Sequence, residues 1–189
     1  MPKETLAKAF FTLKAFQWDP DKGFRLASGI TSPYYVDCRT LLAHPSTRRI
    51  IAELAFQEIH ALNLNAIGGL EIGAIPLATT ISDFGFRAVP PKSWRTFVVR
   101  KEAKDHGLQK LIEGAAQSGD QALIVDDVLT SGGSVMKAIQ VARNAGLEVH
   151  YALVIVDRQE QDGRKAVEQE GISLISLLTL EDLKAKSPT

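Results

Sequence analysis

Apolar residues near the start of the chain recur at helical spacing. They are Leu6, Phe10, Leu13 and Phe16. Their separation by three or four positions predicts an amphipathic helix. A second pattern of this kind runs from Ser46 to Leu62, with Ser46 as its expected N-cap. Between the two, β-forming residues from 24 to 39 are interrupted by Gly29 and Pro33, which predicts a short hairpin or a small sheet.

From residue 66 onward, short apolar runs alternate with helical patterns. The expected strands are Ala66 to Leu70, Thr96 to Arg100, Ala122 to Val128, Tyr151 to Asp157 and Ile172 to Leu178. Helices are expected near Ile75 to Phe84, Val135 to Ala145 and Gly163 to Glu170. Continuously apolar strands that alternate with helices are typical of a parallel sheet covered on both faces. We therefore predict an α/β fold with a parallel twisted sheet flanked by helices.

Length and charge narrow the class of protein. The chain has 189 residues, the size of one ordinary domain. Lys and Arg total 22, as do Asp and Glu, so no global field favours nucleic acid or an anionic membrane. The longest apolar run, Tyr151 to Val156, is far shorter than the roughly 20 residues of a membrane-spanning helix. From the balanced charge and the short apolar runs we expect a protein that binds neither membrane nor nucleic acid. The single cysteine, Cys38, cannot form an internal disulfide, so we also expect the protein to be cytoplasmic.

The richest chemistry follows the apolar strand that starts at Ala122. The run reads Asp126, Asp127, Val128, Leu129, Thr130, Ser131, Gly132, Gly133 and Ser134. Glycines, hydroxyl groups and a helix N-terminus together suit a phosphate, because they place N–H and O–H donors close to an oxyanion. The two carboxylates would repel a phosphate but accept hydrogen bonds from sugar hydroxyls. The loop therefore indicates a sugar phosphate site, and the alternative is a strand-to-helix turn with Asp and Ser capping.

A cationic segment follows the strand that ends near residue 100. Its basic residues are Arg100, Lys101, Lys104 and His106, and Gly107 comes next. Such a cluster suits a pyrophosphate leaving group, whose negative charge grows as its bond to the sugar breaks. The alternative is a solvated basic turn balanced by Glu102 and Asp105.

The motifs resemble, in order and spacing, those of the orotate phosphoribosyltransferases among the type I phosphoribosyltransferases. They are Phe24 to Asp37, Gly68 and Gly69 with Gly73 to Pro76, Arg100 to Gly107, and the Asp126 to Ser134 loop. The resemblance implies a type I phosphoribosyltransferase fold as a single domain over 1–189, with 1–45 contributing a small N-terminal hood. It implies transfer of phosphoribose from 5-phosphoribosyl 1-diphosphate to orotate in UMP biosynthesis, with magnesium. It also implies a homodimer whose active sites are shared between subunits.

The same resemblance implies roles for individual residues. Lys104 and Asp127 would be catalytic, Lys104 acting on the departing pyrophosphate in the transition state. Contacts to 5-phosphoribosyl 1-diphosphate would come from Arg100, Lys101, Lys104, His106 and the residues from Asp126 to Ser134. Contacts to orotate would come from Thr130, Arg158, Tyr34 and Tyr35. Magnesium would be carried by the diphosphate, with no direct protein ligand.

The chemistry of Arg158 agrees with that role, because a guanidinium can bind a carboxylate through two parallel hydrogen bonds. Without the resemblance, Arg158 would be read as a surface or ion-pair residue, and Tyr34 and Tyr35 as packing in a small core. Two positions depart from some relatives, since Ala27 and Gly73 stand where those proteins have lysines. A purine phosphoribosyltransferase and a non-catalytic regulator that senses the diphosphate remain as alternative functions.

Overall fold

The fold is built on a six-stranded sheet, seen in a computed structural model that describes residues 2–26, 29–102 and 111–186. The strand order is β10-β9-β8-β5-β6-β7. The strands are β5 (Ala66–Leu70), β6 (Arg95–Val99), β7 (Ile112–Gly114), β8 (Gln121–Leu129), β9 (Glu148–Asp157) and β10 (Ser173–Thr179). Neighbours pair in parallel except β6 and β7, which are antiparallel. The predicted α/β fold is confirmed, and its sheet is parallel except for the antiparallel edge strand β7.

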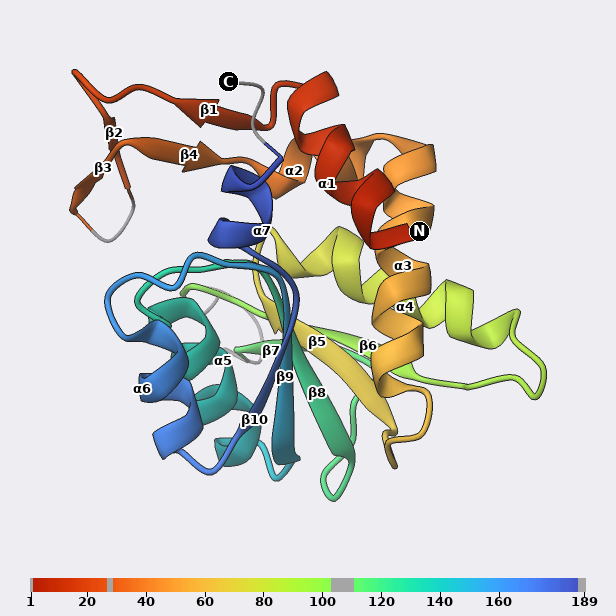
Figure 1. The fold of residues 1–189 in the computed structure, drawn as a ribbon. Helices are drawn as coiled ribbons and strands as arrows, with labels where there is room; N and C mark the ends of the chain where they lie inside the picture. Colours follow the sequence, from red (N-terminus) through yellow and green to blue (C-terminus); the bar gives the residue numbers. More distant parts are fainter. Residues whose placement is uncertain (1, 27–28, 103–110, 187–189) are drawn as a thin grey trace.

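Helices cover both faces of this sheet (Figure 1). One face carries α5 (Gly133–Asn144) and α6 (Gly163–Gln169), and the other carries α3 (Pro45–Ile59) and α4 (Ala74–Phe86). Successive side chains of β8 alternate between the two cores, with Leu123 and Val125 toward α3 and α4 and Ala122 and Ile124 toward α5. Burial on both faces explains why these strands read as continuous apolar runs.

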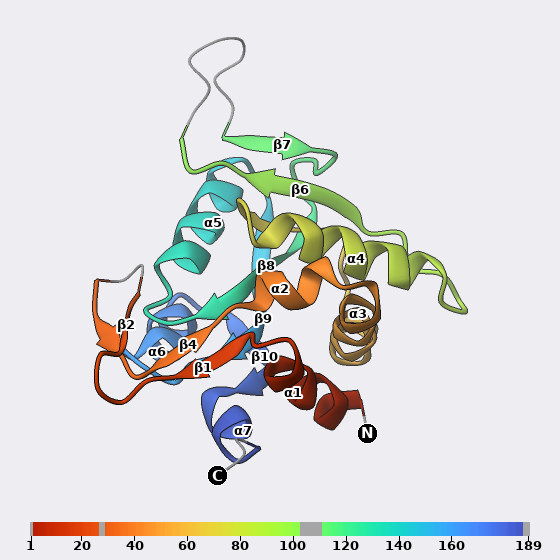
Figure 2. The same ribbon diagram turned by 90° about the horizontal axis from the view of Figure 1, so that it is seen from above.

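The N-terminal strands form a separate layer above the sheet in Figure 1. Strand β1 (Phe16–Trp18) pairs with β4 (Tyr34–Val36), and β2 (Phe24–Arg25) pairs with β3 (Thr31–Ser32), both antiparallel. Seen from above, β1 and β4 run beside α6 and the β9–β10 side of the sheet (Figure 2). The N-terminal strands therefore approach the loops on that side.

Three local features differ from the predicted elements. Helix α1 (Pro2–Thr12) ends before Phe16, which belongs to β1. Helix α3 begins at Pro45 and not after Ser46, because proline suits the first helical turn, where its missing N–H costs nothing. Strand β7 and the short helices α2 (Cys38–Ala43) and α7 (Leu180–Lys184) were not predicted.

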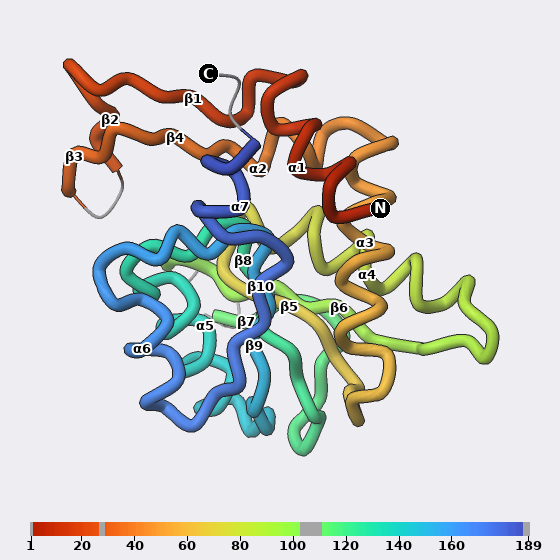
Figure 3. Tube along the Cα trace, viewed as in Figure 1, coloured from red at the N-terminus to blue at the C-terminus, as the bar shows by residue number. Residues whose placement is uncertain are grey.

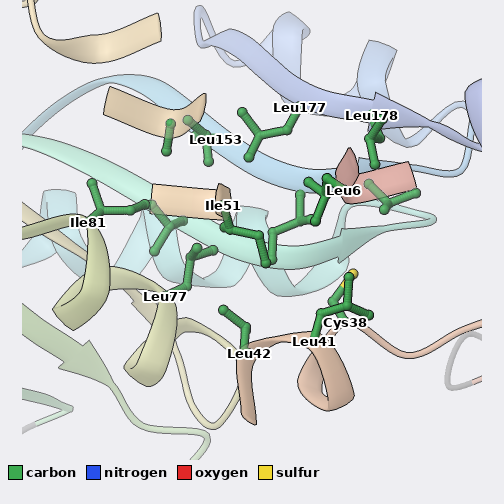
Figure 4. Packing of buried hydrophobic residues seen from close by; sticks show 14 of the residues in the cluster. Leu6, Cys38, Leu41, Leu42, Ile51, Leu77, Ile81, Leu153, Leu177 and Leu178 are labelled. Atoms are coloured by element: carbon green, nitrogen blue, oxygen red, sulfur yellow. The ribbon is translucent and has the colours of Figure 1, made fainter. Parts of the chain in front are cut away.

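The larger core joins elements from both ends of the chain. Leu6 of α1, Leu41 of α2 and Ile51 of α3 pack with Leu77 of α4 and Leu153 of β9 (Figure 4). The trace in Figure 3 brings α7 near α1, where Lys3 Nζ lies 3.1 Å from Asp182 Oδ2. None of the helices described here has the length and apolar character needed to cross a membrane.

Candidate active site

The candidate site is a cavity of about 490 Å³ at the carboxyl ends of β5, β8 and β9. Ligands of open parallel sheets bind at this edge. Its lining includes Tyr35 and Arg39 from the N-terminal segment, Glu71 to Gly73 after β5, Lys101 after β6, Asp126 and Asp127 in β8, and Arg158 after β9. A larger cavity of about 570 Å³ lies between α3 and α4, but none of the motif residues lines it. The chemistry of the lining residues therefore favours the cavity at the sheet edge as the candidate active site.

Two adjacent carboxylates, Asp126 and Asp127, lie near the end of β8. The backbone N–H of Asp127 donates to Asp126 Oδ1 at 2.9 Å, and that of Val128 donates to Asp127 Oδ1 at 2.9 Å. Burial, reinforced by the charge of Asp127, raises the pKa of Asp126 to about 8. Burial also raises the pKa of Asp127. The pair therefore holds a proton near neutral pH, and hydroxyl donors from a ligand would favour its release.

The loop after β5 approaches Asp127 at Gly73. A Cβ built on Gly73 would lie 2.8 Å from Asp127 Cγ, closer than side chains tolerate. Since the Asp127 carboxylate is held by the Val128 N–H, a larger residue at position 73 would displace it. The absence of a side chain at Gly73 thus allows this loop to pack against the Asp127 carboxylate.

The raised pKa of Asp126 is expected to make the free energy of unfolding depend on pH. Asp126 is protonated in the folded chain up to about pH 8 but ionised above about pH 4 when unfolded. Its contribution to stability is therefore complete below pH 4 and is lost as pH rises toward 8. We expect Asp126→Asn to gain stability over wild type by up to about 1.4 kcal/mol per pH unit across this window. Urea unfolding at pH 5, 7 and 9 measures the difference, and a difference independent of pH would contradict the assignment.

A smaller cavity of about 340 Å³ adjoins the first and is formed by the Asp126 to Ser134 loop. Gly132 has a φ of 82°, a left-handed conformation that favours glycine, and α5 begins at the next residue. Thr130, Ser131 and Ser134 line this cavity together with the first residues of α5. Hydroxyl groups therefore surround a helix N-terminus, an arrangement suited to an anion.

Arg158 lies after β9 and is almost fully buried, with 2% of its side chain exposed. Its Nε donates to Glu160 Oε2 at 2.8 Å, and its Nη2 donates to Ser32 Oγ at 2.9 Å and to the Tyr34 carbonyl at 3.0 Å. Arg158 is nevertheless one of the residues that line the main cavity. The expected two-nitrogen contact with a ligand is not available in this arrangement, because Nε and Nη2 are engaged within the protein.

The two neighbouring tyrosines differ in position. Tyr35 lines the cavity and packs on Phe24 with ring centroids 5.5 Å apart. The Tyr34 ring stacks on Phe16 at 5.8 Å and carries Lys184 Nζ 4.7 Å from its centroid. Tyr34 is not part of the cavity lining, and its carbonyl group is what meets Arg158. The structure thus brings only one of the expected aromatic pair to the site.

The cationic segment is described only in part, since Lys104 and His106 lie outside the described residues. Lys101 lines the main cavity, and its backbone N–H donates to Glu71 Oε1 at 2.8 Å. Arg100 Nη1 donates instead to Glu113 Oε1 at 3.2 Å, and Arg100 does not line the cavity. Of the two residues of this cationic segment that the structure describes with a basic side chain, only Lys101 borders the site.

Four further charged residues line the cavity without having been assigned a role from sequence. They are Arg25, Asp37, Arg39 and Glu71. Glu71 directly follows β5, so its place at a strand's carboxyl end was the signal that could have identified it. Arg39 is held by Asp37, whose carboxylate lies 3.2 Å from Arg39 Nε and also caps α2. No comparable sequence signal marks Arg25, which reaches the site through the pairing of β2 with β3.

Comparisons with known proteins agree with this geometry. A family model described as "Phosphoribosyl transferase domain" matches residues 38–176. The chain is 40% identical to orotate phosphoribosyltransferase of Pyrococcus horikoshii, over 85% of this chain and 83% of that protein. It is 39% identical to the Aquifex aeolicus protein of the same name, over 85% and 86%.

Solved structures of an orotate phosphoribosyltransferase also superpose on this chain. Mycobacterium tuberculosis H37Rv orotate phosphoribosyltransferase superposes with a TM-score of 0.80 at 31% identity, covering 97% of this chain and 99% of that one. That protein has also been solved in complex with 5-phospho-alpha-D-ribosyl 1-diphosphate, and the complex superposes with a TM-score of 0.76 over 97% and 99% of the two chains.

Proposed function

This chain belongs to the phosphoribosyltransferase family and, within it, to the orotate phosphoribosyltransferases, and we propose that it makes orotidine 5'-monophosphate for UMP biosynthesis. In this reaction the bond between the anomeric carbon and the pyrophosphate oxygen of 5-phosphoribosyl 1-diphosphate breaks. A bond to N1 of orotate forms, and N1 gives up its proton. The observation that carries the proposal is the meeting of Asp126, Asp127, Thr130 and Arg158 in one cavity.

The site divides into three regions in this proposal. The hydroxyls and N–H groups from Thr130 to Ser134 bind the 5-phosphate at the start of α5. Asp126 and Asp127 accept hydrogen bonds from the ribose hydroxyls. Lys101, with Lys104 and His106 carried over from the family motif, neutralises the pyrophosphate as it departs. Arg100 has weaker support, because its guanidinium is paired with Glu113.

Magnesium enters this proposal as part of the diphosphate substrate. Within residues 2–26, 29–102 and 111–186, no group of three or more His, Cys, Asp or Glu side chains could hold a metal ion. Bound to the diphosphate, magnesium would offset the negative charge of the leaving group.

The homodimer is proposed from the family resemblance, and exposed apolar side chains near α4 offer surface for it. Ile72, Ile75, Phe86 and Val89 are 71%, 39%, 67% and 98% exposed. Ile72 also lines the candidate active site. A second copy of the chain that covered Ile72 would therefore lie beside the cavity, as shared active sites require.

A cytoplasmic location is proposed from cysteine usage. Cys38 is the only cysteine, and it is free and fully buried in α2. A chain without any possible internal disulfide suits a reducing compartment.

The base specificity tests the function directly. We expect pyrophosphate release with orotate and magnesium, and poor release with uracil, adenine, guanine or hypoxanthine. Arg158→Ala should lower orotate use by about ten- to a hundred-fold, since a charge-assisted hydrogen bond contributes roughly 1.5 to 3 kcal/mol. Arg164→Ala serves as a matched control, because Arg164 pairs with Asp157 and lies outside the cavity lining.

Other outcomes would identify the alternatives. Preferred use of a purine base would indicate a purine phosphoribosyltransferase. Binding of the diphosphate without pyrophosphate release from any base would indicate a non-catalytic sensor. Equal turnover of uracil and orotate would contradict the role of Arg158, since uracil lacks the carboxylate.

A further inference from the structure

Arg158 belongs to a closed ring of hydrogen bonds that joins two distant parts of the chain. Arg158 Nε donates to Glu160 Oε2 at 2.8 Å, and Arg158 Nη2 donates to Ser32 Oγ at 2.9 Å. Ser32 Oγ lies 3.1 Å from Glu160 Oε1, to which it donates, and this closes the ring. Ser32 comes from β3 of the N-terminal layer, whereas Arg158 and Glu160 follow β9. The ring therefore fastens the N-terminal layer to the base end of the proposed site.

The hydrogen-bonding capacity of Ser32 is fully used. A hydroxyl offers one donor and two acceptor positions. Its hydrogen goes to Glu160, and its two acceptor positions take Arg158 Nη2 and the backbone N–H of Tyr34 at 3.3 Å. Ser32 is also 3% exposed, so water cannot readily replace a lost partner.

The donors of Arg158 are used almost as completely. A guanidinium has five N–H groups, one on Nε and two on each terminal nitrogen. The Nε hydrogen goes to Glu160, and the two on Nη2 go to Ser32 and to the Tyr34 carbonyl. Among the residues that the structure describes, no hydrogen bond engages Nη1. Nη1 is therefore the nitrogen left for a ligand in the cavity that Arg158 lines.

We infer that Ser32 and Glu160 are positioning residues that hold the Arg158 guanidinium so that Nη1 alone meets the carboxylate of the base. This inference rests on the proposed function and adds to it the residues that set base selectivity. Because Glu160 already balances the charge of Arg158, attraction to any anion is weakened. Discrimination between orotate and bases without a carboxylate then depends on the direction of the Nη1 hydrogens. A guanidinium that was free to rotate would not provide this discrimination.

The test is a double-mutant cycle between Ser32 and Arg158. We expect Ser32→Ala to lower kcat/KM for orotate by about ten-fold, as expected when a hydrogen bond to a charged group is lost, while KM for the diphosphate changes by less than about two-fold. In the Arg158→Ala background the same substitution should have almost no further effect on orotate use, because its target is gone. Equal losses in both backgrounds, or a parallel rise in KM for the diphosphate, would overturn the inference.

Two further variants keep the result interpretable. Ser176→Ala removes a similar serine partner of an arginine, since Ser176 Oγ accepts from Arg164 Nη2 at 3.0 Å, and it should leave orotate use unchanged. Should Ser32→Ala fail to fold, Glu160→Gln keeps the side-chain volume and removes the ion pair. Removing the Glu160 charge strengthens the attraction of Arg158 for an anion but frees the guanidinium to rotate. We expect the lost orientation to dominate and to lower kcat/KM for orotate by about three-fold or more, and this loss must also vanish in the Arg158→Ala background.

The wild-type assay distinguishes failure of the proposed function from failure of the positioning role. A wild-type protein that does not use orotate would refute the proposed function itself. A wild-type protein that uses orotate, with variants at Ser32 and Glu160 whose effects are independent of Arg158, would refute only the positioning role.

Discussion

Asp127→Asn is expected to lower turnover of orotate by about 100-fold or more, which corresponds to two charge-assisted hydrogen bonds of roughly 1.5 to 3 kcal/mol each. Asp127 Oδ1 is held by the Val128 N–H at 2.9 Å, and the carboxylate lines the cavity. An asparagine would lose the negative charge and present an NH₂ group to ribose hydroxyls that are themselves donors. The charge also matters for the rate, because positive charge develops on the ribose as pyrophosphate leaves.

Initial rates of pyrophosphate release measure this effect, and calorimetry gives the accompanying change in affinity for 5-phosphoribosyl 1-diphosphate. Asp21→Asn is a suitable control, since Asp21 is exposed in the turn between β1 and β2. Tight magnesium binding by the free protein that disappears in Asp127→Asn would argue for a protein metal site instead. In that case the assignment of Asp127 to the ribose would be abandoned.

Lys104→Ala should reduce turnover by roughly 100- to 1,000-fold, the range seen when one donor to a developing charge is removed. The motif from Arg100 to Gly107 motivates this proposal, while Lys104 itself lies outside the described residues. If the lysine contacts the pyrophosphate mainly as its charge grows, the affinity for substrates should change little. Lys165→Ala on the exposed side of α6 is the control and should retain full turnover.

The same variant tests whether active sites are shared between subunits. Lys104→Ala and Asp127→Asn are each expected to retain about 1% of wild-type turnover or less, but a mixed dimer would carry both defects in one site and none in the other. After random exchange of equal amounts, about half of the dimers are mixed, so about a quarter of wild-type activity should return by two-fold symmetry. Exchange confirmed by mass spectrometry without recovered activity would mean that each subunit builds its own site.

The sequence by itself determined the fold class and most of the sheet. Residues 66–70 form β5 as predicted, and the other predicted strands are present with ends that differ by a few residues. Strands buried on both faces leave a signal that is local, because most of their positions must be apolar. Strand β7, at the edge of the sheet, has only three residues. Three residues are too few for a periodic hydrophobic pattern to appear in the sequence.

The candidate site was predicted in outline for a similar reason. Parallel strands bring their carboxyl ends to one edge, so the order of strands and loops along the chain is enough to place the Asp126 to Ser134 loop near Arg158. The two tyrosines show the limit of this reasoning. Adjacent residues of a strand point to opposite faces, so Tyr34 and Tyr35 could not both enter the cavity, and the tertiary packing of Phe16 and Lys184 decided which one does not.

Only the tertiary structure decided which nitrogens of Arg158 are engaged within the protein. From sequence its guanidinium was free to bind a ligand through two nitrogens. In the fold, Ser32, which precedes it by 126 positions, and Glu160 engage Nε and Nη2 and leave Nη1. Such contacts leave no periodic or local signal, because they depend on where the N-terminal layer docks on the sheet and not on the residues adjacent to Arg158. The presence of an arginine at this end of the cavity is therefore a property of the sequence, whereas its orientation is a property of the fold.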